Sequence, residues 1–309
     1  MKSKFISIII PVLNEQGSIE PLYKKLKSVL DRVKHEIIFV DDGSTDNTPD
    51  IISKLKNKDK NVRSIISRRN FGKSAALAAG LKNSTGEVII TMDGDLQDDP
   101  SDISKFLEKI NKGYDLIVGW KPRKYRWYNL KIIPSKIFNI LTRLLTGLKL
   151  HDFDCPFKAF KRTVIGGLDI YGELHRYIPV LVHQKGFKIG EVKIKNLSRV
   201  YGKSKFGYSR IMKGFLDLIT VFFLTRFVKR PLHFFGSVGL TLLFLGLILG
   251  MYLIIKRLIF GILIVKEAFI LLAILSIILG VQFISIGLIG EMLANLNHGE
   301  KDEDVFREK

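Results

Sequence analysis

The sequence of 309 residues contains two kinds of apolar pattern, one in its first 120 residues and the other in its C-terminal part. In the first 120 residues, short β-branched or apolar runs alternate with longer stretches of amphipathic or polar helical character. The runs are 5–10, 36–40, 62–66, 87–92 and 114–119, and the helical stretches are 17–33, 46–57, 73–83 and 101–112. Alternation at this spacing predicts parallel strands joined by crossover helices. Because the runs are almost continuously apolar, we expect an α/β fold whose sheet is covered on both faces.

The C-terminal part contains two long stretches without charge. Residues 231–255 contain no Asp, Glu, Lys or Arg, and neither do residues 268–290. A helix needs about 20 apolar residues to cross the bilayer core, and backbone in hydrocarbon must satisfy its own hydrogen bonds. The sequence therefore predicts a transmembrane hairpin rather than two core helices of a soluble protein. The N-terminal apolar run ends at Pro11 and is too short for a signal peptide.

The distribution of charge predicts how the chain is oriented in the membrane. Lys and Arg number 49 against 30 Asp and Glu, a net charge of +19, and 47% of residues are hydrophobic, too many for a disordered chain. Residues 199–230 contain eight basic residues and one acidic residue, Asp217. The positive-inside rule then predicts a membrane protein with its large N-terminal part and both termini in the cytoplasm, although the loop 256–267 is also basic. A single cysteine, Cys155, excludes an intrachain disulfide framework.

Acidic and amide residues follow the predicted strands. They lie in the segments 11–15, 41–46, 68–73 and 93–100. Ligands of open α/β sheets bind beyond the carboxyl ends of the strands, so we expect these four segments to form one site. Asp93 and Asp95 can converge on one hard cation, Mg²⁺ or Mn²⁺, and leave positions for substrate phosphates. A solvated acidic turn is the alternative for this pair.

The second and third of these segments carry candidate nucleotide contacts. Asp41 and Asp42 can accept from a base N–H or a ribose hydroxyl, and Arg69, Asn70 and Lys73 are placed to meet base, ribose or phosphate. A solvated helix start is the alternative for the last three. Ser44 or Asp46 is expected to cap the helix that begins near residue 47, a role that uses neither Asp41 nor Asp42.

The motifs of the four segments together resemble those of the family 2 glycosyltransferases. They read P-x-x-N-E, V-D-D-G-S-x-D, R-N-x-G and D-G-D-L-Q-D-x-P. With two C-terminal spans, the chain is most similar to the polyprenyl-phosphate glycosyltransferases related to dolichol-phosphate mannose and glucose synthases. The resemblance implies a GT-A fold, Rossmann-like with a mostly parallel sheet. It divides the chain into a GT-A domain (1–198), a basic lid with juxtamembrane interfacial helices (199–230), the transmembrane hairpin (231–290) and a charged cytoplasmic tail (291–309).

The resemblance also implies roles for individual residues. Asp93 and Asp95 would bind Mg²⁺ or Mn²⁺. The residues expected to bind the nucleotide-sugar in the first four segments are Pro11, Asn14, Glu15, Asp41, Asp42, Arg69, Asn70, Lys73, Asp93 and Gln97.

Two later segments support the resemblance. Residues 151–158 are similar to a D-x-x-x-G-F-[RK] segment whose Asp lies at the reacting centre, with Asp152 and Asp154 as competing matches and Pro156 in place of the usual Gly. Asp95, Asp152 and Asp154 are therefore the catalytic candidates. Residues 199–205 are similar to an R-x-x-G-x-S-K loop that closes over the donor phosphates, which implies donor contacts by Arg199, Ser204 and Lys205.

A basic segment between the two halves is the candidate acceptor site. Residues 116–151 contain eight Lys or Arg and no acidic residue, and 129–148 repeat apolar residues at helical spacing. This pattern predicts a cationic helix in the headgroup layer of an anionic bilayer, with a core helix bearing a solvated basic face as the alternative. The residues expected to bind the acceptor phosphate are Arg123, Arg126, Lys131 and Lys136. Nucleic acid is an unfavoured partner because the charge adjoins the spans and no nucleic-acid-binding motif occurs.

The resemblance implies a metal-dependent hexosyltransferase. It would transfer a hexose with inversion from UDP-glucose or a similar UDP- or GDP-hexose to undecaprenyl or dolichyl phosphate, for cell-envelope or glycan assembly. Homo-oligomers, tetramers among them, are common among similar proteins. A processive polysaccharide synthase and a non-catalytic membrane-anchored sugar-nucleotide-binding protein are the alternatives. The first has more spans and a Q-x-x-R-W segment, in which Arg123 stands at the Gln position here.

Overall fold

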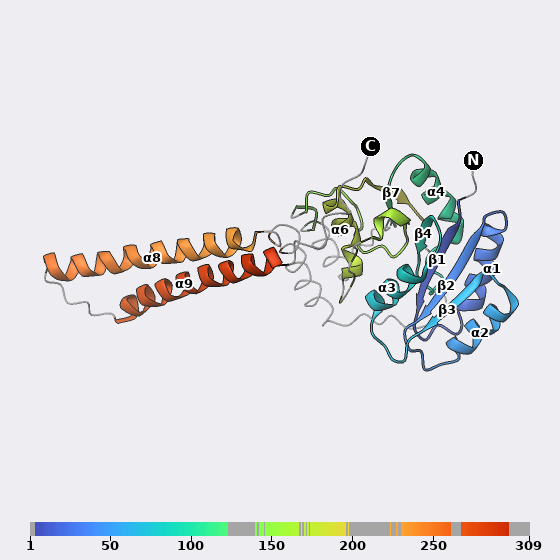
Figure 1. Ribbon diagram of the computed structural model, residues 1–309, viewed down its shortest axis with the longest axis horizontal. Coiled ribbons are helices and arrows are strands. Elements are labelled where there is room, and N and C mark those ends of the chain that lie inside the picture. Colours follow the sequence, from blue (N-terminus) through green and yellow to red (C-terminus); the bar gives the residue numbers. More distant parts are fainter. Residues whose placement is uncertain are drawn as a thin grey trace. The chain divides into compact units, whose positions relative to one another are not determined.

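The computed structural model consists of two compact units, Met1–Val221 and Phe222–Lys309. The structure describes residues 4–122, 140, 142–144, 146–166, 168, 170, 172, 174–195, 197, 223, 227, 230–260 and 267–296. The first unit contains a β-sheet with helices packed on it, and the second contains a helical hairpin (Figure 1).

In the described part of the first unit, seven strands form one sheet in the order β3-β2-β1-β4-β6-β5-β7. They are β1 (Ile6–Val12), β2 (His35–Asp41), β3 (Val62–Ile66), β4 (Val88–Thr91), β5 (Leu116–Trp120), β6 (Lys158–Lys161) and β7 (Ile189–Lys193). Strands β1 to β4 are mutually parallel, as are β5 and β7, whereas β6 is antiparallel to β4 and β5. The predicted α/β fold with a mostly parallel sheet is confirmed, and all five predicted strands are present.

Four helices of the first unit lie where the helical stretches of the sequence predict them. They are α1 (Ile19–Leu30), α2 (Thr48–Lys58), α3 (Lys73–Asn83) and α4 (Ile103–Asn111), and the unit also contains α6 (Ile178–Gln184) and the 3₁₀ turns η1 (Pro100–Asp102), η2 (Arg162–Val164) and η3 (Leu174–Arg176). Successive residues of a strand point to opposite faces, and Ile8, Ile9 and Ile10 of β1 are all fully buried. The sheet is therefore covered on both faces, as expected; α6 was not predicted.

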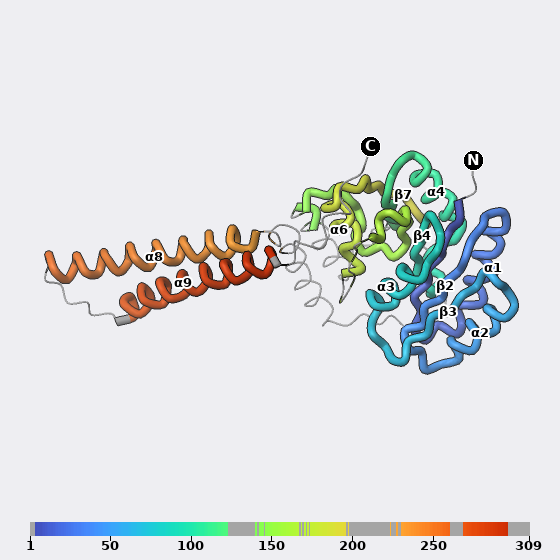
Figure 2. Tube along the Cα trace, in the orientation of Figure 1, coloured from blue at the N-terminus to red at the C-terminus, as the bar shows by residue number. Residues whose placement is uncertain are grey.

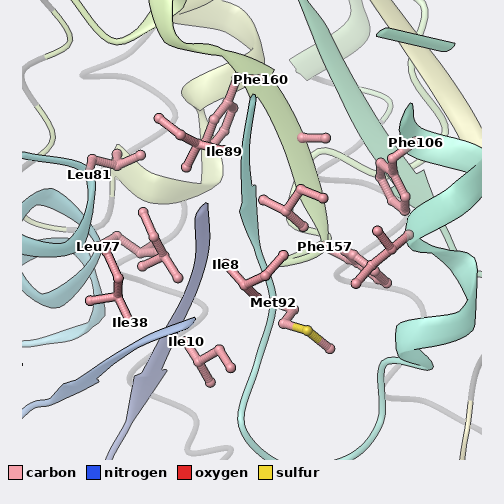
Figure 3. Close-up of a cluster of buried hydrophobic side chains, with 14 of the residues drawn as sticks. Ile8, Ile10, Ile38, Leu77, Leu81, Ile89, Met92, Phe106, Phe157 and Phe160 are labelled. Carbon is pink, nitrogen blue, oxygen red and sulfur yellow. The ribbon is translucent and has the colours of Figure 1, made fainter. Parts of the chain in front are cut away.

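A continuous apolar core joins the sheet to the helices (Figure 3). Ile38 of β2 lies near Leu77 of α3, while Phe106 of α4 stacks on Phe157 with ring centroids 4.4 Å apart. Each such side chain contributes roughly 1.5–3 kcal/mol when removed from water. This burial makes the sheet a rigid platform for the loops at its edges.

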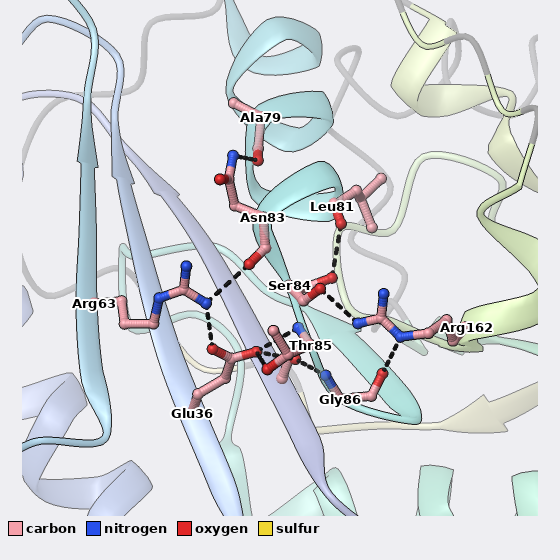
Figure 4. A network of polar contacts seen from close by, with 10 residues as sticks. Glu36, Arg63, Ala79, Leu81, Asn83, Ser84, Thr85, Gly86 and Arg162 are labelled. Carbon is pink, nitrogen blue, oxygen red and sulfur yellow. Dashed lines mark hydrogen bonds and ion pairs between the residues drawn. The ribbon is translucent and has the colours of Figure 1, made fainter.

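The amino-terminal edge of the sheet is closed by a polar network (Figure 4). Glu36 accepts hydrogen bonds from Ser7 Oγ (2.6 Å), Thr85 N (2.6 Å) and Arg63 Nη1 (2.6 Å). Arg162 donates to the carbonyl oxygen of Gly86 (2.9 Å). Burial raises the pKa of Glu36, but the hydrogen bonds that Glu36 accepts outweigh burial and the pKa lies below its ordinary value. The network holds the starts of β1 and β2 and lies at the sheet edge opposite the acidic loops.

The second unit is a pair of antiparallel helices, α8 (Pro231–Phe260) and α9 (Glu267–Leu296), which lie side by side (Figures 1 and 2). Among the described residues, the candidate membrane spans are Pro231–Ile259 and Ala268–Asn295, with mean hydropathies of 2.5 and 2.7. Both helices thus contain the predicted uncharged stretches and continue beyond them. At the ends of the helices, the Leu232 N–H donates to Oε2 of Glu291 (3.2 Å).

Small residues allow the two helices to approach closely. A Cβ atom on Gly239 would lie 2.7 Å from the Gly280 carbonyl oxygen, and one on Gly246 would lie 2.9 Å from the Ala273 carbonyl oxygen. A Cβ atom on Gly250 would meet nothing within 4 Å among the described residues. Within the small-xxx-small pattern formed by Gly246 and Gly250, Gly246 therefore packs inside the hairpin and Gly250 does not.

Candidate functional site

The strand register brings the acidic loops to the carboxyl edge of the sheet. Val12, the last residue of β1, is paired with Asp41, the last residue of β2. A Cβ atom on Gly94 would lie 2.7 Å from Val12 Cγ1, so the D-x-D loop packs on the end of β1. A Cβ atom on Gly43, whose φ is +77°, would lie 2.6 Å from the carbonyl carbon of Arg69. All four predicted segments therefore meet at one edge, as expected from the parallel strands.

Hydrogen bonds join the first two loops. The Asn14 N–H donates to Ser44 Oγ (2.9 Å), and the Thr45 N–H donates to Asn14 Oδ1 (2.8 Å). Asn14 has a φ of +55°, a left-handed conformation that Asn tolerates well. Asp46 accepts from the N–H of Thr48, the first residue of α2 (3.0 Å), whereas the N-cap residue of α2 is Asn47, which makes no side-chain capping hydrogen bond. The predicted cap by Ser44 or Asp46 is therefore wrong. Asn14 therefore links the loop after β1 to the loop after β2.

Asp41 and Asp42 are adjacent in sequence but have different contacts. Asp42 accepts from the N–H groups of Phe71 and Gly72, each at 2.8 Å, and so ties the second loop to the third. Asp41 is fully buried, and its Oδ1 accepts from Ser44 N (3.0 Å) and Ser44 Oγ (2.5 Å). No donor among the described residues reaches Oδ2 of Asp41. A buried acceptor without a donor costs about 1–3 kcal/mol, so a ligand N–H or O–H at this oxygen would be favoured.

The two aspartates of the D-x-D motif have nearby partners. Lys73 Nζ, from the first residue of α3, lies 2.5 Å from Asp93 Oδ1. Burial lowers the pKa of Lys73, but the charge of Asp93 outweighs this effect and the pKa lies above its ordinary value. Asp95, 7% exposed, accepts from both the backbone N–H (3.1 Å) and the side-chain amide (2.7 Å) of Gln97. Lys73 and Gln97, both predicted site residues, thus contact the predicted metal ligands.

A buried ion pair contacts the backbone of the D-x-D loop. Asp98 Oδ1 lies 2.7 Å from Lys121 Nζ, and Asp98 Oδ2 accepts from the Asp93 N–H (3.3 Å). Lys121 follows the last residue of β5. Neither residue was predicted as part of the site, although Asp98 lies in the D-L-Q-D motif and Lys121 is the first basic residue of the segment 116–151.

The reacting-centre candidates lie in the segment that precedes β6. Asp152 Oδ1 accepts from the Asp154 N–H (3.2 Å), and Arg176 Nε lies 3.5 Å from Asp154 Oδ1. Lys158 is buried and donates to the carbonyl oxygen of Cys155. Burial lowers the pKa of Lys158, and the charges of Asp152 and Asp154 offset this effect in part. Thr91 Oγ1 donates to the carbonyl oxygen of Pro156 (2.8 Å), which places this segment beside the end of β4, where the D-x-D loop begins.

A further buried contact connects α3 with η3. Ser74 Oγ lies 2.8 Å from His175 Nδ1, and both side chains are buried. Their neighbours in sequence, Lys73 and Arg176, contact Asp93 and Asp154 respectively. Ser74 and His175 are 101 positions apart, and no local pattern in the sequence signals their contact.

Comparison with known proteins identifies the family. A family model described as glycosyl transferase family 2 matches residues 7–168. The chain belongs to glycosyl transferase family 2. This glycosyltransferase is 36% identical over 300 residues to dodecaprenyl-phosphate galacturonate synthase of Rhizobium johnstonii, with 95% of this chain and 89% of the relative covered. It is 34% identical over 296 residues to undecaprenyl-phosphate 4-deoxy-4-formamido-L-arabinose transferase of Shewanella sediminis, with coverage of 94% and 88%.

Solved structures confirm the GT-A fold of this glycosyltransferase. Glucosyl-3-phosphoglycerate synthase from Mycobacterium tuberculosis, in complex with Mn²⁺ and UDP-glucose, matches with a TM-score of 0.54 at 17% identity. The match covers 72% of this chain and 79% of that chain. At this identity the likeness concerns the fold.

The carboxylates of the glycosyltransferase fit a Mg²⁺ or Mn²⁺ site of a particular type. Among the described residues, no group of three or more His, Cys, Asp or Glu is placed to hold a metal ion. Mg²⁺ at nucleotide sites commonly uses one or two carboxylates and takes its other ligands from phosphates and water. Asp93 and Asp95 supply hard oxygen ligands of this kind, and Lys73 contacts Oδ1 of Asp93. The donor set therefore suits a metal that is completed by substrate phosphate.

Several predicted site residues lie outside the described part of the chain. They are Arg123, Arg126, Lys131 and Lys136 of the acceptor segment, and Arg199, Ser204 and Lys205 of the lid. Among the described residues of the predicted interfacial helix 129–148, Ile140 and Leu144 have apolar side chains that are 52% and 72% exposed. They are four residues apart, a spacing that places them on one face of a helix.

Proposed function

We propose that this family 2 glycosyltransferase transfers a sugar from a nucleotide-sugar to a polyprenyl phosphate at the cytoplasmic face of the cell membrane. The observation that carries the proposal is the combination, in one chain, of acidic loops at the carboxyl edge of a GT-A sheet and two helices apolar enough to span a bilayer. Similarity to two polyprenyl-phosphate sugar transferases over 94% or more of the chain supports it.

The donor is expected to bind along the carboxyl edge. Asp41 accepts a hydrogen bond from the nucleoside, because its buried Oδ2 lacks a donor among the described residues. Asp93 and Asp95 would hold Mg²⁺ or Mn²⁺, which when bound neutralises negative charge on the donor diphosphate. Lys73 and the lid residues Arg199 and Lys205 add positive charge where the leaving nucleoside diphosphate becomes more negative.

The acceptor phosphate is expected to approach from the membrane side along the basic segment. One of its oxygens attacks the anomeric carbon opposite the leaving diphosphate, so the new C–O bond forms with inversion as the sugar–diphosphate bond breaks. A phosphate monoester has a second pKa near 6 and needs little help from a base. Asp152 and Asp154 therefore position the sugar or the acceptor, and Arg176 holds Asp154 in place.

A hexose or a hexose-derived uronate is our proposed sugar, in line with UDP-glucose-type donors. The relatives carry galacturonate and 4-deoxy-4-formamido-L-arabinose in their names, so both belong in the test. Membranes containing the full chain would be incubated with a short-chain prenyl phosphate and a panel of labelled donors: UDP-glucose, UDP-galacturonate, GDP-mannose and UDP-4-deoxy-4-formamido-L-arabinose. Each reaction would be run with and without EDTA.

Organic extraction then separates the possible products. A labelled, acid-labile prenyl-phosphate sugar in the organic phase, formed without EDTA and lost with it, supports the proposal. Label in an insoluble polymer would indicate a processive polysaccharide synthase. Nucleotide-sugar binding without turnover for every donor would indicate a non-catalytic binding protein.

A further inference from the structure

The backbone at the start of α3 is held from two sides. Asp42 accepts from the N–H groups of Phe71 and Gly72, each at 2.8 Å. On the other side, buried Ser74 contacts His175 at 2.8 Å. The backbone between these contacts is therefore fixed by two other loops. The movable part of Lys73 is its side chain, an ammonium on a flexible four-carbon stem.

This side chain neutralises a predicted metal ligand. Lys73 Nζ lies 2.5 Å from Asp93 Oδ1, and the two side chains are 33% and 29% exposed. Charges on Asp154 and Asp98 also favour the ammonium form of Lys73. An ammonium and a divalent cation repel each other, so they cannot both lie at Asp93 without a large electrostatic cost.

We propose that Lys73 is an exchangeable counter-ion, which competes with the divalent cation for Asp93 and contacts the donor diphosphate once it is displaced. The inference rests on the proposed function, because it takes Asp93 as a metal ligand. Metal binding then separates two opposite charges and is weak by itself. A bound diphosphate gives the displaced ammonium a new anionic partner, so the metal and the diphosphate strengthen each other's binding by the same factor.

A permanent structural ion pair is the competing explanation, and it has a different consequence. If Lys73 only stabilised the loop, its removal would loosen Asp93 and weaken metal binding. If Lys73 is a competitor, its removal exposes Asp93 and tightens metal binding. The sign of the change in metal affinity therefore separates the two roles without any measurement of sugar transfer.

The test uses the full chain in nanodiscs of neutral phosphatidylcholine, which adds little Mn²⁺ binding of its own. Binding of Mn²⁺ without nucleotide would be followed through the electron paramagnetic resonance signal of free Mn²⁺. We expect Lys73→Gln to bind Mn²⁺ about tenfold more tightly than wild type, and Lys73→Arg, which keeps the charge, to remain near wild type. Lys82→Gln removes an exposed charge from the same helix and should match wild type.

A second titration follows the diphosphate itself. Inorganic pyrophosphate avoids any dependence on the base, and its binding with saturating Mn²⁺ would be measured by calorimetry. We expect Lys73→Gln to bind pyrophosphate about tenfold more weakly than Lys82→Gln. Unchanged or weaker Mn²⁺ binding by Lys73→Gln, with wild type binding Mn²⁺, would overturn this inference alone. If neither wild type nor Lys73→Gln binds Mn²⁺, with or without pyrophosphate, the metal site of the proposed function fails and the inference fails with it.

Discussion

The carboxylate of Asp98 lies 2.7 Å from the ammonium of Lys121, with side chains that are 0% and 14% exposed. Burial raises the pKa of Asp98, and the charge of Lys121 opposes this rise. The same carboxylate accepts the N–H of Asp93. One buried ion pair therefore connects the D-x-D loop with the end of β5, where the basic acceptor segment begins.

We expect Asp98→Asn to lower the free energy of unfolding by about 3 kcal/mol, because it leaves the Lys121 ammonium buried without its counter-charge. The double variant Asp98→Asn, Lys121→Met removes both charges and should recover part of this loss. Thermal unfolding of the full chain in detergent would measure both effects. Asp31→Asn, at an exposed position, is the control. Equal stability of Asp98→Asn and Asp31→Asn would show that the ion pair contributes nothing.

The strands and the acidic edge could be predicted because their signals are local. Continuous apolar runs predict β1 to β5, and parallel strands must place their carboxyl ends together. β6 (Lys158–Lys161) and β7 (Ile189–Lys193) are short and partly polar, and they pair with strands far away in the sequence. Their hydrophobic pattern therefore gives little signal.

The residues that position the site could not be predicted, because their contact partners lie far away in the sequence. Ser74 and His175, like Arg176 and Asp154, meet because η3 returns to α3 and to the segment before β6. Asp98 is visible in its motif, but the partner that makes it structural, Lys121, is fixed by the tertiary fold. Sequence patterns thus indicate the residues of the site more readily than the residues that position them.

The Glu36 network makes a pH-dependent contribution to stability. The pKa of Glu36 in the folded chain lies below its ordinary value of 4.5, so its stabilisation is complete above that pH. This stabilisation is lost as the pH falls from 4.5 through the lower pKa of Glu36 in the folded chain. We expect Glu36→Gln to be less stable than wild type by about 2 kcal/mol at pH 7. The difference should shrink steadily below pH 4.5, as followed by urea unfolding at several pH values. A difference that is constant with pH would contradict this account of the network.

Glycines of the hairpin should differ in their tolerance of larger residues. Gly239→Val and Gly280→Val place methyl groups against the facing backbone, so we expect a loss of about 1–3 kcal/mol in hairpin stability. Gly250→Val is the matched control, because a Cβ there meets nothing within 4 Å among the described residues. The melting temperature of the full chain in detergent would report the change. A Gly250→Val variant as unstable as Gly239→Val would show that Gly250 has a packing role of its own.

Asp41 should act mainly in nucleotide binding. Asp41→Asn replaces a buried acceptor with a group that can present a donor, and we expect at least a 100-fold loss of affinity for the nucleoside diphosphate of the active donor. The loss reflects an unmade hydrogen bond to a buried charged group. Calorimetry with that nucleotide would measure it. Undiminished affinity would mean that the nucleoside lies elsewhere.

The central claim, that the D-x-D carboxylates serve sugar transfer to a polyprenyl phosphate, is tested most directly by labelled transfer in membranes. Wild type, Asp93→Asn, Asp95→Asn and the exposed control Asp31→Asn would be compared with the donor that is active in the panel, at matched expression and melting temperature. We expect the rate of prenyl-phosphate sugar formation to be about 100- to 1,000-fold lower for the two D-x-D variants. The control should keep the wild-type rate. Transfer at the wild-type rate by Asp93→Asn and Asp95→Asn would contradict the account.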